Sequence, residues 1–377
     1  MSLFKIALKY KKYSALFKED DAKTLPRDIP PLHLRKLTET PEILEEFYPY
    51  TIKDFAIISG KKYTSKYARQ LKKAFLQKGY SADTLELDFK IPTPDLVSRV
   101  VEQFGGCTYV GVGGGSKIDL TKLAAYESRS PAVSVPTVFS HDGISSHIAS
   151  LEVNGSRRSK EVVRPVAVIA DLEIIGAAPK RLNVSGLADA VSNCSALEDW
   201  RLAKERNGRE QVNFSNHAYF AGCLVYNDFL LTQIERKRDV NKMLDTLAAV
   251  LAGSGLLMSI AHSSVPASGS EHLLSHALDA INAERDALHG EQVGVWTIAT
   301  SYLQGQDWRA IKSALQTAGA KTTLADIGVK SERELTGIYD RARQMGKERD
   351  RYTILEERGL VQFKKALQRT GLLEGMG

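Results

Sequence analysis

The chain has 377 residues, of which 43% are hydrophobic and 25% charged, and this composition is normal for a soluble globular protein. Its formal net charge of +6 fits an anionic small substrate, a nucleic acid or a membrane surface, but no zinc-finger, aromatic-stacking or recognition-helix pattern favours nucleic acid. No apolar run reaches the roughly 18 residues of a membrane span, and the length exceeds one ordinary core, so two domains are expected.

The three cysteines, Cys107, Cys194 and Cys223, match no zinc-binding spacing. So few thiols in a chain of this length indicate a reducing compartment, and we expect a cytoplasmic protein. Cys194 lies close in sequence to a metal-ligand candidate described below, but we interpret it as a small packed residue and not as a ligand.

Residues 1–35 are interpreted as an N-terminal extension followed by a linker. Lys5 and Lys9 interrupt any signal-peptide core, and three prolines between residues 20 and 34 indicate the linker. Residues 1–18 have helical periodicity, and their basic side chains point away from an apolar face formed by Leu3, Ile6, Tyr10, Tyr13 and Phe17. Such a basic helix is expected to dock on its own protein or on another subunit of a homo-oligomer. Weak contact with an anionic membrane surface is the alternative.

From residue 36 to residue 183, short apolar strand patterns alternate with helical patterns. We expect strands at 55–58, 84–89, 109–112, 132–135 and 166–170, with helices at 67–78, at 96–104 and directly after Ser116. This alternation predicts βαβ units, and therefore an α/β nucleotide-binding domain with a parallel sheet. Ligands of such sheets bind at the carboxyl ends of the strands.

After residue 183 the continuous strand patterns disappear. Helical patterns cover residues 185–206, 214–235, 240–264 and 270–284, and another apolar helix follows His289. Residues 184–377 are therefore predicted to form an all-α domain.

The centre of the first domain is an apolar, β-branched run that ends in three glycines. Tyr109–Val112 are followed by Gly113, Gly114 and Gly115, and Ser116 is expected to cap the next helix. A strand, a glycine turn and a helix N-terminus can together hold phosphate, because glycine allows close approach and the helix end attracts anions. Glycines also mark plain βα turns, so this pattern alone leaves both interpretations open.

The second domain carries candidate ligands for a metal ion. Asp189 and Asn193 are four residues apart, as are His272 and His276, so each pair shares one helical face. His289 is a further histidine, just before an apolar helix. One carboxylate and two imidazoles suit a divalent metal and leave a position open for substrate, but the residues alone do not decide which histidines take part. Single histidines are more often structural, and spacing alone does not bring these segments together.

Five segments in chain order resemble the sn-glycerol-1-phosphate dehydrogenase family. They are YVGVGGGSKID (109–119), SVPTVFSHDG (134–143), SGLADAVSN (185–193), PASGSEHLLSHALD (266–279) and HGEQVG (289–294). The resemblance extends from about residue 50 to the C-terminus and leaves out the N-terminal extension. That family belongs to the superfamily of dehydroquinate-synthase-like proteins and metal-dependent alcohol dehydrogenases.

The resemblance implies a metal site and a catalytic group. Asp189, His272 and His289 match the metal ligands, and we expect zinc first and nickel or iron next. Asp142 matches an acidic position that contacts substrate hydroxyls. Asp142 or His276 would relay a proton through water, or His276 would instead orient a metal ligand.

The resemblance also implies an NAD(P) site. The loop that holds the cofactor pyrophosphate falls on Gly113, Gly114, Gly115 and Ser116, and Asp119 follows it. Thr137 and Ser140 match positions near the nicotinamide. Lys61 and Lys62 follow the first strand, near the expected place of an adenosine 2′-phosphate, so we predict a weak preference for NADPH, although solvated lysines are an equal alternative.

Three positions depart from the family pattern and leave the exact substrate open. Val265 stands where an arginine is expected, Trp296 replaces a glycine, and His147 replaces a proline. An arginine would be a natural partner of a substrate phosphate, and valine cannot take that role. Val265 and Trp296 are also compatible with neutral repacking. Asn193 agrees with the family, where iron alcohol dehydrogenases have a further histidine ligand.

The expected function is reversible NAD(P)-linked oxidation of a secondary alcohol on a small phosphorylated polyol, with sn-glycerol 1-phosphate and dihydroxyacetone phosphate as the favoured pair. A different polyol phosphate remains an alternative substrate. A sugar-phosphate cyclase of the dehydroquinate-synthase type would use the same fold, NAD and metal. A basic membrane- or nucleic-acid-binding protein on this fold is the non-enzymatic alternative.

Overall fold

The computed structural model describes residues 32–49, 53–153, 156–207, 213–281 and 286–376. The amphipathic segment predicted at residues 1–18 lies outside this part of the chain. The chain folds into two compact units, a sheet unit and a helical unit. The sheet unit comprises Pro30–Ala190 and Lys237–Leu256, and the helical unit includes Val191–Arg236 and Leu257–Gly377. The sequence-based division at residues 35 and 183 stays a prediction.

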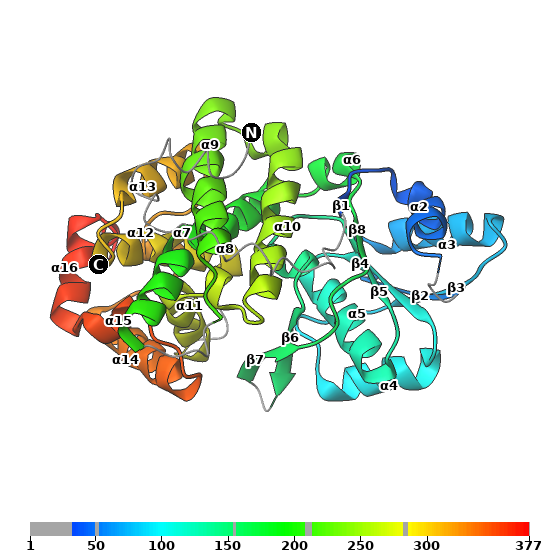
Figure 1. The fold of residues 1–377 in the computed structure, drawn as a ribbon, viewed down its shortest axis with the longest axis horizontal. Coiled ribbons are helices and arrows are strands. Elements are labelled where there is room, and N and C mark those ends of the chain that lie inside the picture. The colour runs from blue at the N-terminus through cyan, green and yellow to red at the C-terminus, as the bar shows by residue number, and fades with distance from the viewer. Residues whose placement is uncertain (1–31, 50–52, 154–155, 208–212, 282–285, 377) are drawn as a thin grey trace. The chain divides into compact units, whose positions relative to one another are not determined.

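A six-stranded parallel sheet forms the centre of the sheet unit (Figure 1). Its order is β1-β8-β5-β4-β2-β3, with bounds β1 (Leu32–His33), β2 (Asp54–Ser59), β3 (Ser81–Glu86), β4 (Thr108–Gly113), β5 (Ala132–Pro136) and β8 (Ala167–Ile169). The predicted α/β domain with a parallel sheet and the helical C-terminal region are confirmed. The chain leaves β2 for β3 on one side and returns to β4 on the other, so the switch in strand order lies between β2 and β4. Ligands of doubly wound sheets bind at such a switch.

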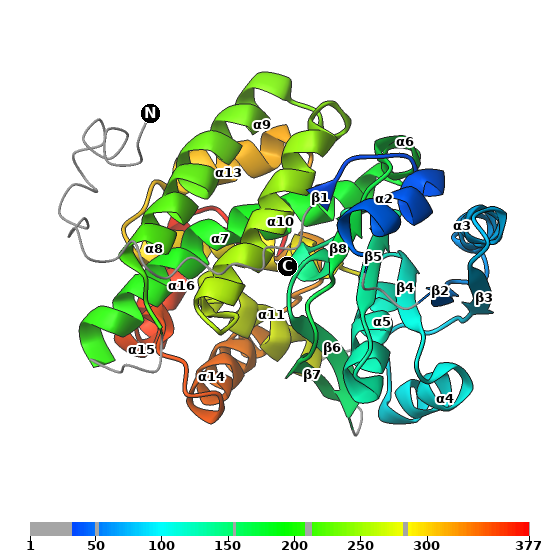
Figure 2. The same ribbon diagram turned by 45° about the vertical axis from the view of Figure 1, so that its right-hand side comes forward.

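Helices cover both faces of this sheet (Figure 2). The helices α2 (Thr40–Phe47) and α3 (Ser65–Gln77) lie on one face, and α4 (Pro94–Phe104) and α5 (Gly115–Ser128) lie on the other. Two hydrophobic cores flank the sheet. Phe55 and Ile57 of β2 belong to one core, and the alternate residues Ala56 and Ile58 belong to the other. A strand that is apolar on both faces reads as a continuous hydrophobic run, which explains why the sequence shows β2 and β4 so clearly.

Some elements of the sheet unit differ from the sequence-based prediction. The strand β1 lies in the predicted linker and pairs with β8, but its two residues give no pattern to detect. The antiparallel hairpin of β6 (Ile148–Val153) and β7 (Ser156–Glu161) was not predicted, because β7 reads SRRSKE and has no apolar side chain. The strand predicted at 84–89 lies at Ser81–Glu86.

Helices dominate the chain after β8. The α-helices are α6 (Leu172–Gly176), α7 (Lys180–Asn207), α8 (Asn216–Cys223), α9 (Leu231–Lys237), α10 (Leu244–Ile260), α11 (Ser270–Ile281), α12 (His289–Leu303), α13 (Trp308–Thr317), α14 (Glu332–Glu348), α15 (Ile354–Glu357) and α16 (Leu360–Arg369). Shorter helical turns are η3 (Leu37–Glu39), η4 (Asp142–Ile144), η6 (Leu224–Leu230), η7 (Val240–Met243), η8 (Val265–Ala267) and η9 (Ala325–Ile327). In the helical unit, α11 packs against α12 and α14, and α12 packs against α13 and α16.

One helical run is long and apolar enough to cross a membrane by length and composition. It covers Val240–Ile260 and has a mean hydropathy of 1.7, so the sequence-based statement that no run reaches this length was wrong. The polar residues at its start masked it in the sequence. Because 67% of its apolar 18-residue window is buried inside the protein, these side chains have the environment of a core helix.

Candidate active site

The glycine loop lies between β4 and α5, next to the switch in strand order. A Cβ on Gly113 would lie 2.8 Å from Lys117 Cγ, and a Cβ on Gly115 would lie only 1.7 Å from His141 Nε2, so the loop excludes larger residues. The N-cap of α5 is Gly114, which has no side chain to bond the first turn. The prediction that Ser116 caps this helix was wrong, because the N-cap is Gly114, two residues earlier. An uncapped helix start on a glycine loop is suited to an anion.

The segment after β5 lies beside the glycine loop. Thr137 N donates to the Gly113 carbonyl over 3.1 Å, which joins the carboxyl ends of β5 and β4. Phe139 N donates to Asn183 Oδ1 over 3.0 Å. A Cβ on Gly186 would lie 1.9 Å from the Phe139 carbonyl, so α7 approaches this segment closely. Ser140 follows directly and is half-buried.

His141 was not singled out in the sequence, but it lies between two glycines of the cofactor region. Its Nδ1 accepts a hydrogen bond of 2.9 Å from Gly143 N, so the neutral ring carries its proton on Nε2. That nitrogen lies over Gly115 at the start of α5. Burial lowers the pKa of His141, although Asp119 and Asp142 oppose the shift. A neutral N–H donor therefore faces the glycine loop.

Lys122 is a second residue that sequence reasoning missed. It is fully buried, and its Nζ donates to the carbonyls of Gly143 at 2.7 Å and Ile148 at 2.5 Å. The same Nζ lies 3.2 Å from Asp119 Oδ1, so the Asp119 carboxylate is paired inside the protein. Burial lowers the pKa of Lys122, and Asp119 opposes this. The only sequence signal was a lysine among apolar positions of a buried helix.

Asp142 begins η4 and links two helices of the sheet unit. Its main-chain N–H donates to Asp189 Oδ2 over 3.0 Å, and its own Oδ2 accepts a bond of 2.7 Å from Ser254 Oγ. Ser145 in the same turn donates to the Leu251 carbonyl over 3.1 Å. The acidic side chain predicted to meet substrate is therefore fixed from α7 and α10.

Three predicted histidines lie together in the helical unit. The ring centroids of His272 and His289 are 5.0 Å apart, and those of His276 and His289 are 6.0 Å apart. His272 Nδ1 lies 2.8 Å from Glu271 Oε1, and a carboxylate can only accept, so His272 presents Nε2 to a ligand. Burial alone would raise the pKa of Glu271, but hydrogen bonds from His272 and Gly269 N lower it overall.

Polar side chains of α11 and α12 contact His289 at the start of α12. Ser275 Oγ lies 3.4 Å from His289 Nδ1 and 2.8 Å from Gln292 Oε1. Gln292 Nε2 in turn donates to Asp279 Oδ1 over 2.9 Å. This series of hydrogen bonds restricts the orientation of the His289 ring.

Asp189, His272 and His289 each offer one ligand atom, and these atoms lie within 4.8 Å of one another. One carboxylate and two imidazoles form a donor set that suits zinc and related divalent ions. His276 is not part of this group. Burial raises the pKa of Cys194, which is fully buried on α7, in agreement with a packed thiol.

The positions that depart from the family pattern have different surroundings. Trp296 is fully buried and its ring stacks on Phe363 with centroids 6.2 Å apart, so it belongs to the core between α12 and α16. Val265 is half-buried at the start of η8. The His147 carbonyl accepts a bond of 2.8 Å from Val162 N beside the β6–β7 hairpin.

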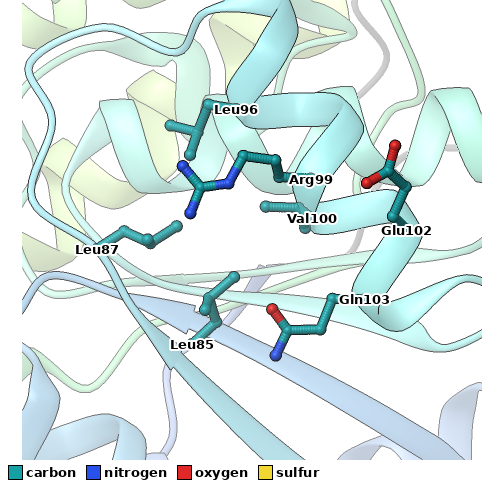
Figure 3. Close-up of a pocket in the computed structure, with 7 residues that line it drawn as sticks. All are labelled: Leu85, Leu87, Leu96, Arg99, Val100, Glu102 and Gln103. Atoms are coloured by element: carbon teal, nitrogen blue, oxygen red, sulfur yellow. The ribbon is translucent and has the colours of Figure 1, made fainter.

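A hollow between β3 and α4 contains none of the predicted site residues (Figure 3). It is lined by Leu85, Leu87, Leu96, Arg99, Val100, Glu102 and Gln103. Arg99 extends across it in the close-up, whereas the carboxylate of Glu102, the other charged residue in its lining, points away. The glycine loop of the sheet unit and the histidines of the helical unit therefore remain the candidate functional groups.

Comparison with known proteins gives consistent matches. Residues 35–179 match the family model of iron-containing alcohol dehydrogenases. A glycerol-1-phosphate dehydrogenase [NAD(P)+] of Pyrococcus abyssi is 41% identical over 272 residues, which cover 70% of this chain and 75% of that protein. One of Pyrobaculum arsenaticum is 34% identical over 347 residues, covering 89% and 94%.

Solved structures with the same fold are more distant in sequence. The glycerol dehydrogenase of Schizosaccharomyces pombe has a TM-score of 0.72 at 16% identity and covers 94% of this chain and 91% of its own. A probable glycerol dehydrogenase of Sinorhizobium meliloti has a TM-score of 0.71 at 17% identity, covering 91% and 96%.

Proposed function

The chain belongs to the glycerol-1-phosphate dehydrogenase family, and we propose that it interconverts sn-glycerol 1-phosphate and dihydroxyacetone phosphate with NAD(P) and a divalent metal. The observation that carries this proposal is the group of Asp189, His272 and His289, whose ligand atoms lie within 4.8 Å of one another. Zinc is the first candidate for the ion, followed by nickel and iron.

Bound at these residues, the ion would act as a Lewis acid on the substrate oxygen, and NAD(P) would carry the redox chemistry. The protein's own residues prepare this site. Glu271 accepts a hydrogen bond from Nδ1–H of His272, which leaves Nε2 as the ligand atom. Ser275 and Gln292 restrict His289.

Asp142 is the proposed contact for a substrate hydroxyl. Ser254 occupies Oδ2 of its carboxylate, which leaves Oδ1 to accept a bond from a hydroxyl or from a water that carries the proton. His276 lies one turn after His272 and would support a ligand or relay the proton. Its ring centroid is 6.4 Å from that of His272.

The cofactor is proposed to lie on the loop Gly113–Ser116, with Thr137 and Ser140 beside the nicotinamide. The uncapped start of α5 supports a pyrophosphate there. Asp119 is proposed to act through Lys122, with which it pairs, and not as a direct ligand. Lys61 and Lys62 are exposed after β2, and they support a weak preference for NADPH.

The alternatives are less well supported. The matched relatives are named as dehydrogenases, which favours that chemistry over a cyclase and over a non-enzymatic binding protein. A different polyol phosphate held beside Trp296 is not supported, because that side chain is enclosed in the helical core. We further propose a homo-oligomer, a cytoplasmic location in keeping with three free cysteines, and weak membrane-surface contact through residues 1–18 as the alternative role of that segment.

A substrate screen tests the proposal directly. The purified protein, loaded with zinc, nickel or iron, is assayed with NADH and NADPH against dihydroxyacetone phosphate and other keto-phosphates. We expect the highest kcat/KM with dihydroxyacetone phosphate and tighter binding of NADPH. A higher kcat/KM of the metal-loaded protein with another keto-phosphate would contradict dihydroxyacetone phosphate as the substrate. A tenfold preference for NADH would refute the role of the two lysines.

A further inference from the structure

Arg351 is a largely buried cation in the helical unit. It lies in the connection between α14 and α15, and its guanidinium donates from Nη1 to the Ser268 carbonyl and from Nη2 to Ser264 Oγ at 2.6 Å. Both acceptors are neutral, and no carboxylate among the described residues lies within ion-pair distance of it. Burial lowers the pKa of Arg351 to about 10, so the group remains charged at neutral pH.

The main chain that carries Arg351 is held by several hydrogen bonds. Asp199 Oδ1 accepts a bond of 2.8 Å from Ile354 N, and its Oδ2 accepts one of 2.7 Å from Ser270 N, so a single buried carboxylate ties the Arg351 segment to the start of α11. Arg351 N also donates to the Gly346 carbonyl over 2.8 Å. A cation ordered in advance loses less conformational entropy when an anion binds.

The guanidinium of Arg351 has more hydrogen-bond donors than its two acceptors use. It has five N–H donors, and two of them are used by Ser264 and Ser268. Glu271 is the acidic group whose charge acts on it, and one oxygen of that carboxylate, Oε1, accepts bonds from Gly269 N and His272 Nδ1. A planar guanidinium with spare donors matches the geometry of a phosphate, and a buried charge is unfavourable without a counter-charge.

The two residues that Arg351 contacts lie near the proposed metal ligand His272 in the sequence. Ser268 is four residues before His272, and Ser264 directly precedes Val265, where the resemblance to the family implies an arginine. We propose that Arg351 binds the phosphate of the substrate and supplies the cation that Val265 cannot. This inference rests on the proposed function, because it assigns the phosphate end of that same substrate.

The test compares a phosphorylated with an unphosphorylated ketone in the full-length, metal-loaded enzyme. Arg351→Met removes the charge and keeps the length of the side chain, and Arg351→Lys keeps the charge. Arg341→Met is the matched control, because Arg341 makes an exposed ion pair of 2.8 Å with Glu348 on α14. For Arg351→Met we expect the KM for dihydroxyacetone phosphate to rise roughly ten- to hundredfold, with kcat/KM for dihydroxyacetone unchanged. Arg351→Lys should recover part of the loss, and Arg341→Met should match the wild type.

A merely structural arginine gives a different pattern. If Arg351 only ties Ser264 to Ser268, Arg351→Met lowers kcat/KM for both ketones equally, and that result overturns the proposal, as does an unchanged KM for dihydroxyacetone phosphate. Calorimetry with inorganic phosphate separates this inference from the proposed function, because it needs no turnover. If the wild type does not reduce dihydroxyacetone phosphate, the proposed function fails, and weaker phosphate binding by Arg351→Met still supports an anion site. Equal phosphate binding by both proteins refutes it.

Discussion

The carboxylate of Asp189 is the single oxygen ligand in the proposed metal group, so its charge should decide whether an ion is retained. Asp189→Asn keeps the shape and the bond from Asp142 N but removes the negative charge. We expect metal content and turnover to fall by at least tenfold without loss of the fold, because a neutral amide is a weak ligand for zinc. Metal analysis of dialysed protein, with circular dichroism as a fold control, measures this.

A double substitution gives the opposing test at the same site. His272→Ala/His289→Ala removes both imidazoles and leaves Asp189 in place. Full metal occupancy in that variant contradicts the assignment of all three ligands.

His141 should give the folded protein a defined pH dependence. Its pKa is lowered by burial from the ordinary value of about 6.5, so below that pH the unfolded chain takes up a proton that the folded chain does not. The contribution of His141 to stability is therefore complete above pH 6.5 and is lost as the pH falls. His141→Asn should show a smaller decrease in the free energy of unfolding between about pH 7 and pH 5, measured by urea unfolding.

The control for this pH effect is His262→Asn, because His262 is exposed. Its unfolding free energy should follow the wild-type pH profile. If His141→Asn also keeps the wild-type slope, the ring is not held neutral by its surroundings.

At the scale of the element, the turn from β4 into α5 depends on the absence of a side chain. A methyl group at Gly115 would overlap the His141 ring, since its Cβ would lie 1.7 Å from Nε2. We expect Gly115→Ala to weaken NAD(P) binding roughly tenfold or more, because overpacking typically costs about 1–3 kcal/mol and displaces the loop. Fluorescence titration of NADPH measures this change.

Two further variants show whether this clash is the cause. Gly115→Ala/His141→Ala removes the ring that the methyl group meets and should restore part of the cofactor affinity. Gly337→Ala is a neutral control, because its Cβ would lie 3.6 Å from Ile281 Cδ1, an ordinary contact between α14 and α11. A double variant as weak as the single one would mean that the glycine is needed for another reason.

The strands and helices with strong periodicity could be predicted from sequence, and those fixed by partners could not. The buried runs of β2 and β4 appear as continuous apolar segments, and α7 and α11 appear as long helical patterns. The strand β1 has only two residues, and β7 is polar throughout, so both depend on the strands beside them. The start of α5 was misplaced because Ser116 is a good capping residue in general, whereas here the turn is made by Gly114.

For the whole molecule, the sequence motifs predicted which residues form the candidate sites but not the long-range contacts that hold them in place. Asp189, His272 and His289 could be named from the resemblance, while their approach to within 4.8 Å is a property of the folded chain. Lys122 bonds to carbonyls at Gly143 and Ile148, and Arg351 to oxygens at Ser264 and Ser268. Such long-range polar contacts leave no local pattern, because each partner taken alone is an ordinary lysine, arginine or serine.

The substrate of the whole enzyme can be tested through the departure at Val265. If Arg351 already holds the phosphate, Val265→Arg adds a second cation to an occupied loop, and the KM for dihydroxyacetone phosphate should stay within about threefold of the wild type. Without such a cation, the loss of one charge-assisted bond of about 1.5–3 kcal/mol would leave wild-type affinity roughly ten- to hundredfold weaker. In that case Val265→Arg should lower the KM by tenfold or more, and a different polyol phosphate would be the native substrate. Steady-state kinetics of the wild type, Val265→Arg and Val265→Met, the last as a control for side-chain size, distinguish these outcomes.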